Sequence, residues 1–136
     1  MQITRQADYA LRAIIFLSKL TADEKASTSV IAEEKKIPPS FLAKIISQLS
    51  IAGIIHTSRG ARGGVSLAKP PEDITVLDVI EAIDGPILLN DCTVNPDNCP
   101  FSKDCELHDI WTGAREDLVE KLGGVTFARL VSMPAD

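Results

Sequence analysis

Residues 38–67 have the sequence PPSFLAKIISQLSIAGIIHTSRGARGGVSL, and this stretch decides the fold. Proline is tolerated in the first turn of a helix, and Gly53 suits the position just beyond a helix end. Between them, apolar residues recur at helical spacing and predict a buried stripe made of Phe41, Leu42, Ile45, Ile46, Leu49 and Ala52. The opposite face carries hydrogen-bonding groups, namely Ser40, Lys44, Ser47 and Gln48.

The second half of the stretch, from Ile54 to about Pro70, predicts a strand, a glycine-rich turn and a second strand. The turn carries two arginines, Arg59 and Arg62. A glycine-rich loop can also hold a nucleotide phosphate, but the pattern G-x-x-x-x-G-K-[ST] is missing and no helix is expected directly after the glycines. A basic hairpin that approaches DNA is the better interpretation.

Two helices are predicted upstream of this stretch. The first runs from Thr4, a good N-cap, to about Leu20. The second is capped by Ser27 and ends near Lys36, because the residue before Pro38 is biased away from helical geometry. Two short helices joined by a tight turn form a helix-turn-helix, and a basic hairpin after it makes a winged helix. We therefore predict a mainly α fold with a small β wing.

This fold predicts how the chain contacts DNA. The helix after Pro38 would enter the major groove, and the arginines of the wing would approach the backbone or the minor groove. The predicted phosphate contacts are Arg12, Lys44, Arg59 and Arg62, and the predicted groups for the base edges are Ser40 and Gln48. Ser47, on the same face of the helix, is a further predicted DNA-binding residue.

The charge of the chain is divided along its length. Residues 1–69 hold ten basic and five acidic residues, whereas residues 70–136 hold four basic and fourteen acidic ones, so +5 and −10 give the net −5. Ordinary surface scatter could produce such a difference, but a winged helix in the basic half favours a polyanion-binding surface. We predict a DNA-binding region over 1–70 and a region over 71–136 with the metal-binding loop and dimerisation helices.

The second half also predicts helices. Thr75 can cap one that ends at Gly85, and a short one is expected over 126–131. A long helix is predicted from about Leu107 to Leu122. One face of this helix is an apolar seam of Leu107, Ile110, Trp111, Ala114 and Leu118. The earlier helices fill a small core, so we expect this seam to contact a two-fold mate in a homodimer.

Three cysteines, the only ones in the chain, lie in the segment DCTVNPDNCPFSKDC at residues 91–105. Cys92, Cys99 and Cys105 are soft ligands suited to zinc or to iron–sulfur clusters, and His108 follows them. Gaps of six and five residues do not match the paired knuckles of structural zinc sites, and an odd number argues against a closed disulfide framework. The alternative is that the three thiols are unrelated and lie in a polar surface loop without a metal, but free cysteines prefer burial. The segment favours a metal centre, with iron–sulfur ahead of zinc.

With these motifs in view, the chain resembles the Rrf2-type winged-helix regulators, which include iron–sulfur regulators of the IscR and NsrR types. The resemblance rests on the opening ITRQADYALRAIIFL, the wing SRGARGGVSLA and the cysteine cluster, in the family's order. It implies a dimeric DNA-binding regulator with a 2Fe–2S or 4Fe–4S cluster on the three cysteines. The first gap has six residues where the family usually has five, and Ala43 stands where IscR-like members carry a glutamate.

A cluster needs a fourth ligand besides three cysteines. The resemblance implies either Asp8, donated by the other subunit as in NsrR-like members, or His108, as in IscR-like members. We favour Asp8, and with it a 4Fe–4S cluster, over His108. Asp8 could instead form an i,i+4 ion pair with Arg12, and His108 could simply be solvated.

The sequence thus predicts a regulator, with repression as the expected output, whose operator affinity is switched by an iron–sulfur cluster that senses redox state, nitric oxide, or iron and cluster supply. The alternatives are an iron–sulfur electron-transfer or cluster-carrier protein and a zinc-stabilised DNA-binding protein that does not sense. Neither His56 nor His108 has a suitable nucleophile nearby, so no enzyme is predicted. Because no stretch could span a bilayer and charged residues interrupt the N-terminal segment, we expect a cytoplasmic protein and no membrane partner.

Overall fold

A mainly α-helical unit carries one small antiparallel sheet, as predicted. The computed structural model of the chain describes residues 2–90, 97, 99–101 and 104–133. Along the chain its elements are α1 (Arg5–Ser18), α2 (Thr28–Lys35), α3 (Pro39–Ile51), β1 (Ile55–Ser58), β2 (Gly64–Leu67), the 3-10 helix η1 (Pro71–Asp73), α4 (Val76–Asp84), α5 (His108–Gly123) and α6 (Phe127–Ser132).

The predicted helix starts are confirmed by their hydrogen bonds. The Thr4 hydroxyl accepts from the Ala7 amide at 3.1 Å, and the Ser27 hydroxyl accepts from the Val30 amide at 3.2 Å. Thr75 and Asp78 form a reciprocal capping box at the start of α4. These side chains satisfy amides that have no partner inside the helix, so the local sequence fixes where each helix begins.

The turn between α2 and α3 depends on one left-handed residue. Lys36 has a φ of 54°, and its neighbour Ile37 is 2% exposed and donates its amide to the Ala32 carbonyl at 2.9 Å. Ile37 thereby anchors the turn in the core, while Pro39 begins α3. The tight connection that defines a helix-turn-helix is therefore built from this apolar anchor.

The core draws on both halves of the chain. α1 contributes small residues such as Ala10 and Ala13, which let α3 and α4 pack closely against it. From beyond residue 70 come Ile74, Val79 and Phe127, all at most 1% exposed. The Phe127 amide donates to the Ile74 carbonyl at 3.0 Å and joins α6 to the segment before α4. The division at residue 70 remains a prediction about function, because the packing is continuous across it.

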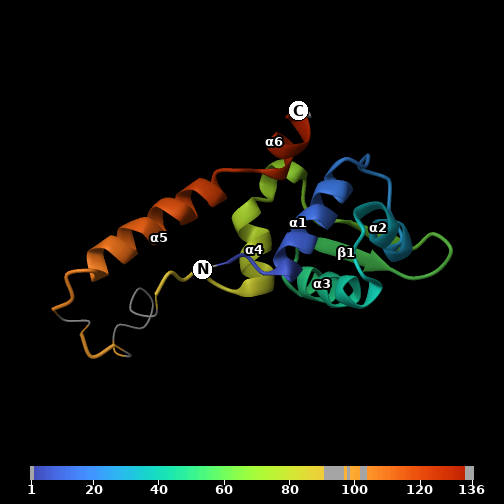
Figure 1. The fold of residues 1–136 in the computed structure, drawn as a ribbon. Coiled ribbons are helices and arrows are strands. Elements are labelled where there is room, and N and C mark those ends of the chain that lie inside the picture. Colours follow the sequence, from blue (N-terminus) through green and yellow to red (C-terminus); the bar gives the residue numbers. More distant parts are fainter. Residues whose placement is uncertain (1, 91–96, 98, 102–103, 134–136) are drawn as a thin grey trace.

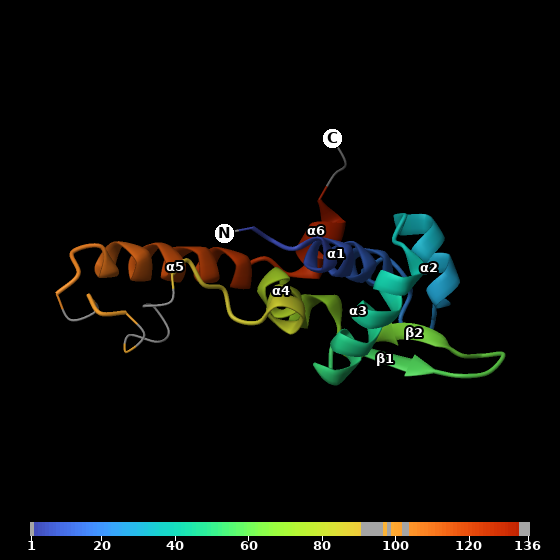
Figure 2. The ribbon, with the colours of Figure 1, turned by 60° about the horizontal axis from the view of Figure 1, so that its bottom comes forward.

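Two elements project from opposite ends of this core, as Figures 1 and 2 show. The hairpin of β1 and β2 lies at one end, with Ile55 opposite Leu67 and Ser58 opposite Gly64. α5 extends from the other end, beyond α4, and none of its residues is buried. Among the described residues, no helix is long and apolar enough to cross a membrane.

Candidate DNA-binding face and candidate metal centre

The predicted recognition helix, α3, presents a polar open face. Ser40, Lys44 and Ser47 are exposed on it, as the sequence predicts. Gln48 is only half-buried, and its Oε1 is enclosed without a hydrogen-bond partner among the described residues. It lies at the edge of the buried stripe, so only part of its side chain is available to DNA.

The buried stripe of α3 is narrower than predicted. Leu42, Ile45, Ile46 and Leu49 are buried, but Ala52 is exposed and Phe41 keeps 39% of its surface exposed. Phe41 meets Tyr9 of α1 edge-on, with ring centroids 6.0 Å apart. An edge-to-face ring pair of this kind couples the two helices directly.

A groove of about 490 Å³ separates α3 from the wing. Among the described residues that line it, Arg59 is the one charged residue and there is no carboxylate; the others are Ser27, Thr28, Ala43, Ile46, Thr57, Ser58, Gly60, Gly63, Gly64 and Val65. The start of α2 also faces it through Ser27 and Thr28. Hydroxyls, a guanidinium and the positive end of a helix dipole suit a phosphodiester backbone. Arg62 is exposed on the same turn, outside the groove lining.

Two predicted site residues on α1 pair with each other. The Arg12 Nε donates to an Asp8 carboxylate oxygen at 3.0 Å, and the two side chains are 58% and 51% exposed. This is the i,i+4 ion pair that the sequence left as an alternative for Asp8. Because surface pairs are weak, both groups can exchange partners when another charge approaches.

Two of the three predicted cysteine ligands lie within the described residues. Cys99 and Cys105 are free thiols and half-buried, whereas Cys92 lies outside the described residues. Over the part of the chain that is described, no three histidine, cysteine or acidic side chains come together at metal-binding distance. A three-cysteine centre therefore depends on Cys92 as well.

His108 lies one turn after Cys105, at the start of α5. Its amide donates to the Cys105 carbonyl at 3.2 Å, which fixes the two residues relative to each other. Its Nδ1 is buried and has no hydrogen-bond partner among the described residues. A buried ring nitrogen without a hydrogen-bond partner among the described residues fits a metal-ligand position, since such nitrogens otherwise find a partner.

The predicted dimer seam on α5 is open in the single chain. Leu107 is 50% and Ile110 58% exposed, Ala114 is exposed, and Trp111 and Leu118 are half-buried. A row of apolar side chains on a projecting helix leaves a surface that a partner can cover.

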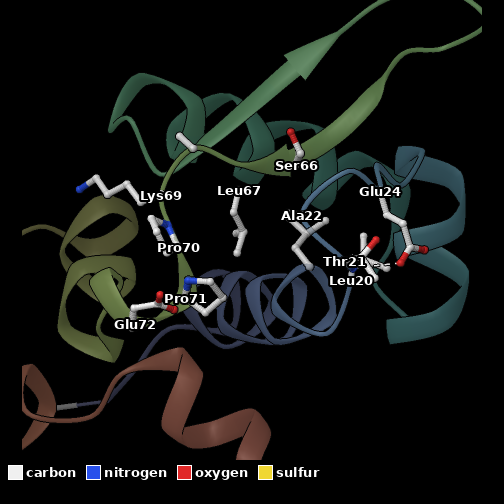
Figure 3. Close-up of a pocket in the computed structure, with 12 residues that line it drawn as sticks. Leu20, Thr21, Ala22, Glu24, Ser66, Leu67, Lys69, Pro70, Pro71 and Glu72 are labelled. Carbon is white, nitrogen blue, oxygen red and sulfur yellow. Dashed lines mark hydrogen bonds between the residues drawn. The ribbon is translucent and has the colours of Figure 1, made fainter.

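A second hollow lies behind the wing, shown in Figure 3. It has a volume of about 450 Å³ and lies between the end of α1 and residues 66–72, with Leu17 and Leu67 among its lining. Glu24 is one of its lining residues. Hydrogen bonds from the backbone and side chain of Thr21 lower the pKa of this carboxyl, which favours its ionised form. No residue of α3 lines it, so it is not part of the recognition face.

A helix-turn-helix with an exposed polar recognition face, followed by a basic hairpin, defines a winged-helix DNA-binding regulator. Family and structure comparisons agree with that class. The Rrf2 family model, described as "Iron-dependent Transcriptional regulator", matches residues 3–133, so the chain belongs to the Rrf2 family of transcriptional regulators and is not an enzyme. Members of this family bind DNA and are generally dimers.

Individual relatives support the assignment. A protein of Aquifex aeolicus (strain VF5), named as an HTH-type transcriptional regulator, is 34% identical over 127 residues, which cover 92% of this chain and 88% of that protein. CymR, the global cysteine regulator of B. subtilis, shares 28% identity with a TM-score of 0.80 over 99% of both chains. T. potens IscR, at 23% identity and a TM-score of 0.75 over 100% of this chain and 94% of that one, shows the same fold.

The sequence did not predict two contacts that shape the site. The Lys25 ammonium donates to the Ser58 hydroxyl at 3.2 Å, and the Thr4 hydroxyl donates to an Asp84 carboxylate oxygen at 2.6 Å. The partners are 33 and 80 residues apart in sequence, and no local pattern indicates such pairs. The sequence contains one weak signal for the contact of Asp84. This carboxylate is the last residue of α4, where the helix dipole disfavours a negative charge, so a partner elsewhere in the fold is expected.

Proposed function

We propose that this regulator is a repressor that binds double-stranded DNA as a homodimer and that an iron–sulfur cluster switches its operator affinity. Cys92, Cys99 and Cys105 would hold the cluster. Such a cluster, when bound, supplies a centre that reacts with oxidants and nitric oxide or reports iron and cluster supply. The observation that carries the proposal is the buried Nδ1 of His108, which has no hydrogen-bond partner among the described residues and belongs to the residue three positions after the free thiol of Cys105.

The fourth ligand has two candidates with different geometry. His108 is supported by its enclosed, unpartnered Nδ1 one turn from Cys105 in the same chain. Asp8 is engaged by Arg12 in this chain, so as a ligand from a partner subunit it would have to exchange that ion pair for the metal. We therefore propose His108 as the fourth ligand ahead of Asp8. The expectation of a 4Fe–4S cluster depended on Asp8, so this proposal does not specify the number of iron atoms.

The chain offers a route from the cysteine segment to the DNA-binding face. On α5, Arg115 donates its Nε to the carbonyl of Ile87 at 2.7 Å, just after α4. At the end of α4, the Asp84 carboxylate accepts from the Thr4 hydroxyl and thereby holds the cap of α1. α1 in turn contacts α3 through Tyr9 and Phe41. Displacement of residues 85–90 would be passed to the recognition helix by these contacts, as a two-state switch requires.

One observation favours a second candidate function. The likeness to CymR covers 99% of both chains, and CymR is named a cysteine regulator. A regulator of this second kind would respond to cysteine supply through its thiols or a partner, without a metal. A zinc-stabilised protein and an electron carrier are further outcomes that the same experiment separates.

The test is anaerobic purification followed by counts of iron, acid-labile sulfide and zinc per chain. We expect a coloured protein with iron and sulfide, and a change in operator affinity of about 5- to 150-fold when the cluster is removed. Cys99→Ser and Cys105→Ser should abolish iron binding. A colourless protein, or an operator affinity that is indifferent to iron, contradicts the proposal.

The fourth ligand is tested with matched variants. His108→Ala should change the visible spectrum of the cluster, whereas His56→Ala removes the other histidine, on the exposed face of β1, and should not. If Asp8→Ala changes the spectrum and His108→Ala does not, the ligand is Asp8. Mixed dimers of parent and Asp8→Ala would then each retain one intact site, because that ligand comes from the partner.

A further inference from the structure

The wing is tied to the segment that precedes α2. Ala26 and Val65 exchange two backbone hydrogen bonds, of 3.0 and 2.7 Å, so Ala26 extends the sheet beside β2. Gly64 permits this approach: a Cβ there would lie 2.9 Å from the Ala26 carbonyl oxygen and 3.1 Å from the Lys25 Cβ, and its φ is 149°. The position of Lys25 relative to the wing is therefore fixed by the backbone.

The side chain of Lys25 crosses to the far strand of the wing. Its ammonium donates to the hydroxyl of Ser58, the last residue of β1 and a lining residue of the groove between α3 and the wing. Arg59 follows directly in the chain and lines the same groove. Two positive charges thus lie beside a groove whose described lining residues include no carboxylate.

The charge of Lys25 is not neutralised within the described part of the chain. The ion pair found there joins Arg12 to Asp8, and Lys25 takes part in none. A lysine that is fixed by a neutral hydroxyl keeps its full charge and two further N–H donors for an anion. A surface lysine without a partner would lose side-chain entropy on binding DNA, and the bond to Ser58 reduces that loss.

We propose that Lys25 is a further DNA-contacting residue, which binds a phosphate of the strand that enters the groove, and that Ser58 is the positioning residue that holds its ammonium. This contact adds to those of Arg59 and Arg62 and places the end of the loop before α2 in the interface. The inference rests on the proposed DNA-binding face and is independent of the cluster.

Three variants separate charge from position. Lys25→Gln removes the charge but keeps a donor for Ser58, Lys25→Arg keeps the charge, and Ser58→Ala removes the acceptor while the charge stays. Binding is measured on the full chain by anisotropy, from 50 to 200 mM salt. The probe is a 30-base-pair duplex selected from a random pool by the parent protein.

Loss of one phosphate contact lowers the slope of log affinity against log salt by about 0.9 for each half-site. If counterion release accounts for the whole contact, Lys25→Gln weakens binding per half-site about 15-fold at 50 mM salt and about fourfold at 200 mM. Lys25→Arg should restore the slope of the parent. Ser58→Ala should keep that slope and weaken binding about two- to fivefold, because a mobile side chain must be ordered.

Lys121→Gln is the matched control, since Lys121 is an exposed lysine in the last turn of α5 and belongs neither to the wing nor to the lining of the groove. It should leave both slope and affinity unchanged. An unchanged slope for Lys25→Gln, whether or not the affinity falls, overturns the proposed phosphate contact. If the parent itself fails to select or bind any duplex, the proposed DNA-binding function fails instead.

Discussion

Replacing Ile110 by alanine should weaken self-association without weakening the fold. Ile110 belongs to the apolar seam on α5 and is 58% exposed. Complete burial of an isoleucine side chain contributes about 1.5–3 kcal/mol, so covering its exposed part contributes about 0.9–1.7 kcal/mol per protomer. A two-fold interface uses the residue twice, which gives about 1.7–3.5 kcal/mol per dimer.

Alanine retains one of the four side-chain carbons, so about 1.3–2.6 kcal/mol is lost. At 1.4 kcal/mol for each factor of ten, the dimer dissociation constant should rise about 10- to 70-fold. Sedimentation velocity over a concentration series measures this constant. At concentrations where the protein is monomeric, the melting temperature should change little, because the deleted atoms are mostly in solvent in the single chain.

Ile51→Ala provides the matched control for this measurement. Ile51 is 85% exposed at the end of α3 and lies outside the seam, so the same atoms are deleted from a surface that no partner is expected to cover. Self-association of Ile110→Ala that equals that of the parent would refute the seam as the dimer contact. Equal weakening by Ile51→Ala would show that general surface hydrophobicity, and not the seam, drives association.

Two further predictions concern the wing and the cap of α1. Arg59→Ala should weaken binding to every duplex, specific or not, and lower the salt slope by about 0.9 per half-site, as titrations at several salt concentrations would show; an unchanged slope would remove Arg59 from the phosphate contacts. Asp84→Asn should lower the free energy of unfolding by about 0.5–1 kcal/mol in urea titrations, because the carboxylate supports the Thr4 cap and the dipole of α1. Asp117→Asn, at an exposed site on α5, should leave that free energy unchanged, and equal losses in both variants would contradict the role of Asp84.

The order of elements could be predicted because short-range chemistry specifies it. Thr4, Ser27 and Thr75 each cap a helix at the predicted residue, since an N-cap depends only on the next few amides. Pro38 and Gly53 likewise bracket α3, because proline and glycine act through their own backbone angles. These signals are complete within a few residues and do not depend on the rest of the fold.

The extent of burial could not be predicted as well, because it depends on which elements cover a helix face. Phe41 has the right spacing for the stripe of α3 but lies at its edge, where Tyr9 covers only part of the ring. Gln48 has a polar side chain on the open face and is nevertheless half-buried. Neither outcome follows from periodicity, which gives the direction of a side chain but not the size of its neighbours.

The candidate metal centre was predictable in its residue types and not in its geometry. Cys99, Cys105 and His108 were all named from soft-ligand chemistry and family resemblance. Their arrangement depends on Cys92 and, for Asp8, on a second subunit. The contact from Asp84 to Thr4 shows the same limit, since it joins residues that are 80 positions apart.

The burial of Phe127 has a consequence for the order in which the protein is made. Phe127 is 0% exposed in the core that also holds Ile14 and Leu42, and it lies 22 residues beyond Cys105. A nascent chain leaves the ribosome from its N-terminus, so the helix-turn-helix emerges before Ile74, Val79 and Phe127, which complete its core. The domain reaches full stability only after the cysteines have also been synthesised. The DNA-binding unit therefore reaches its full stability only after the segment that would regulate it has been made.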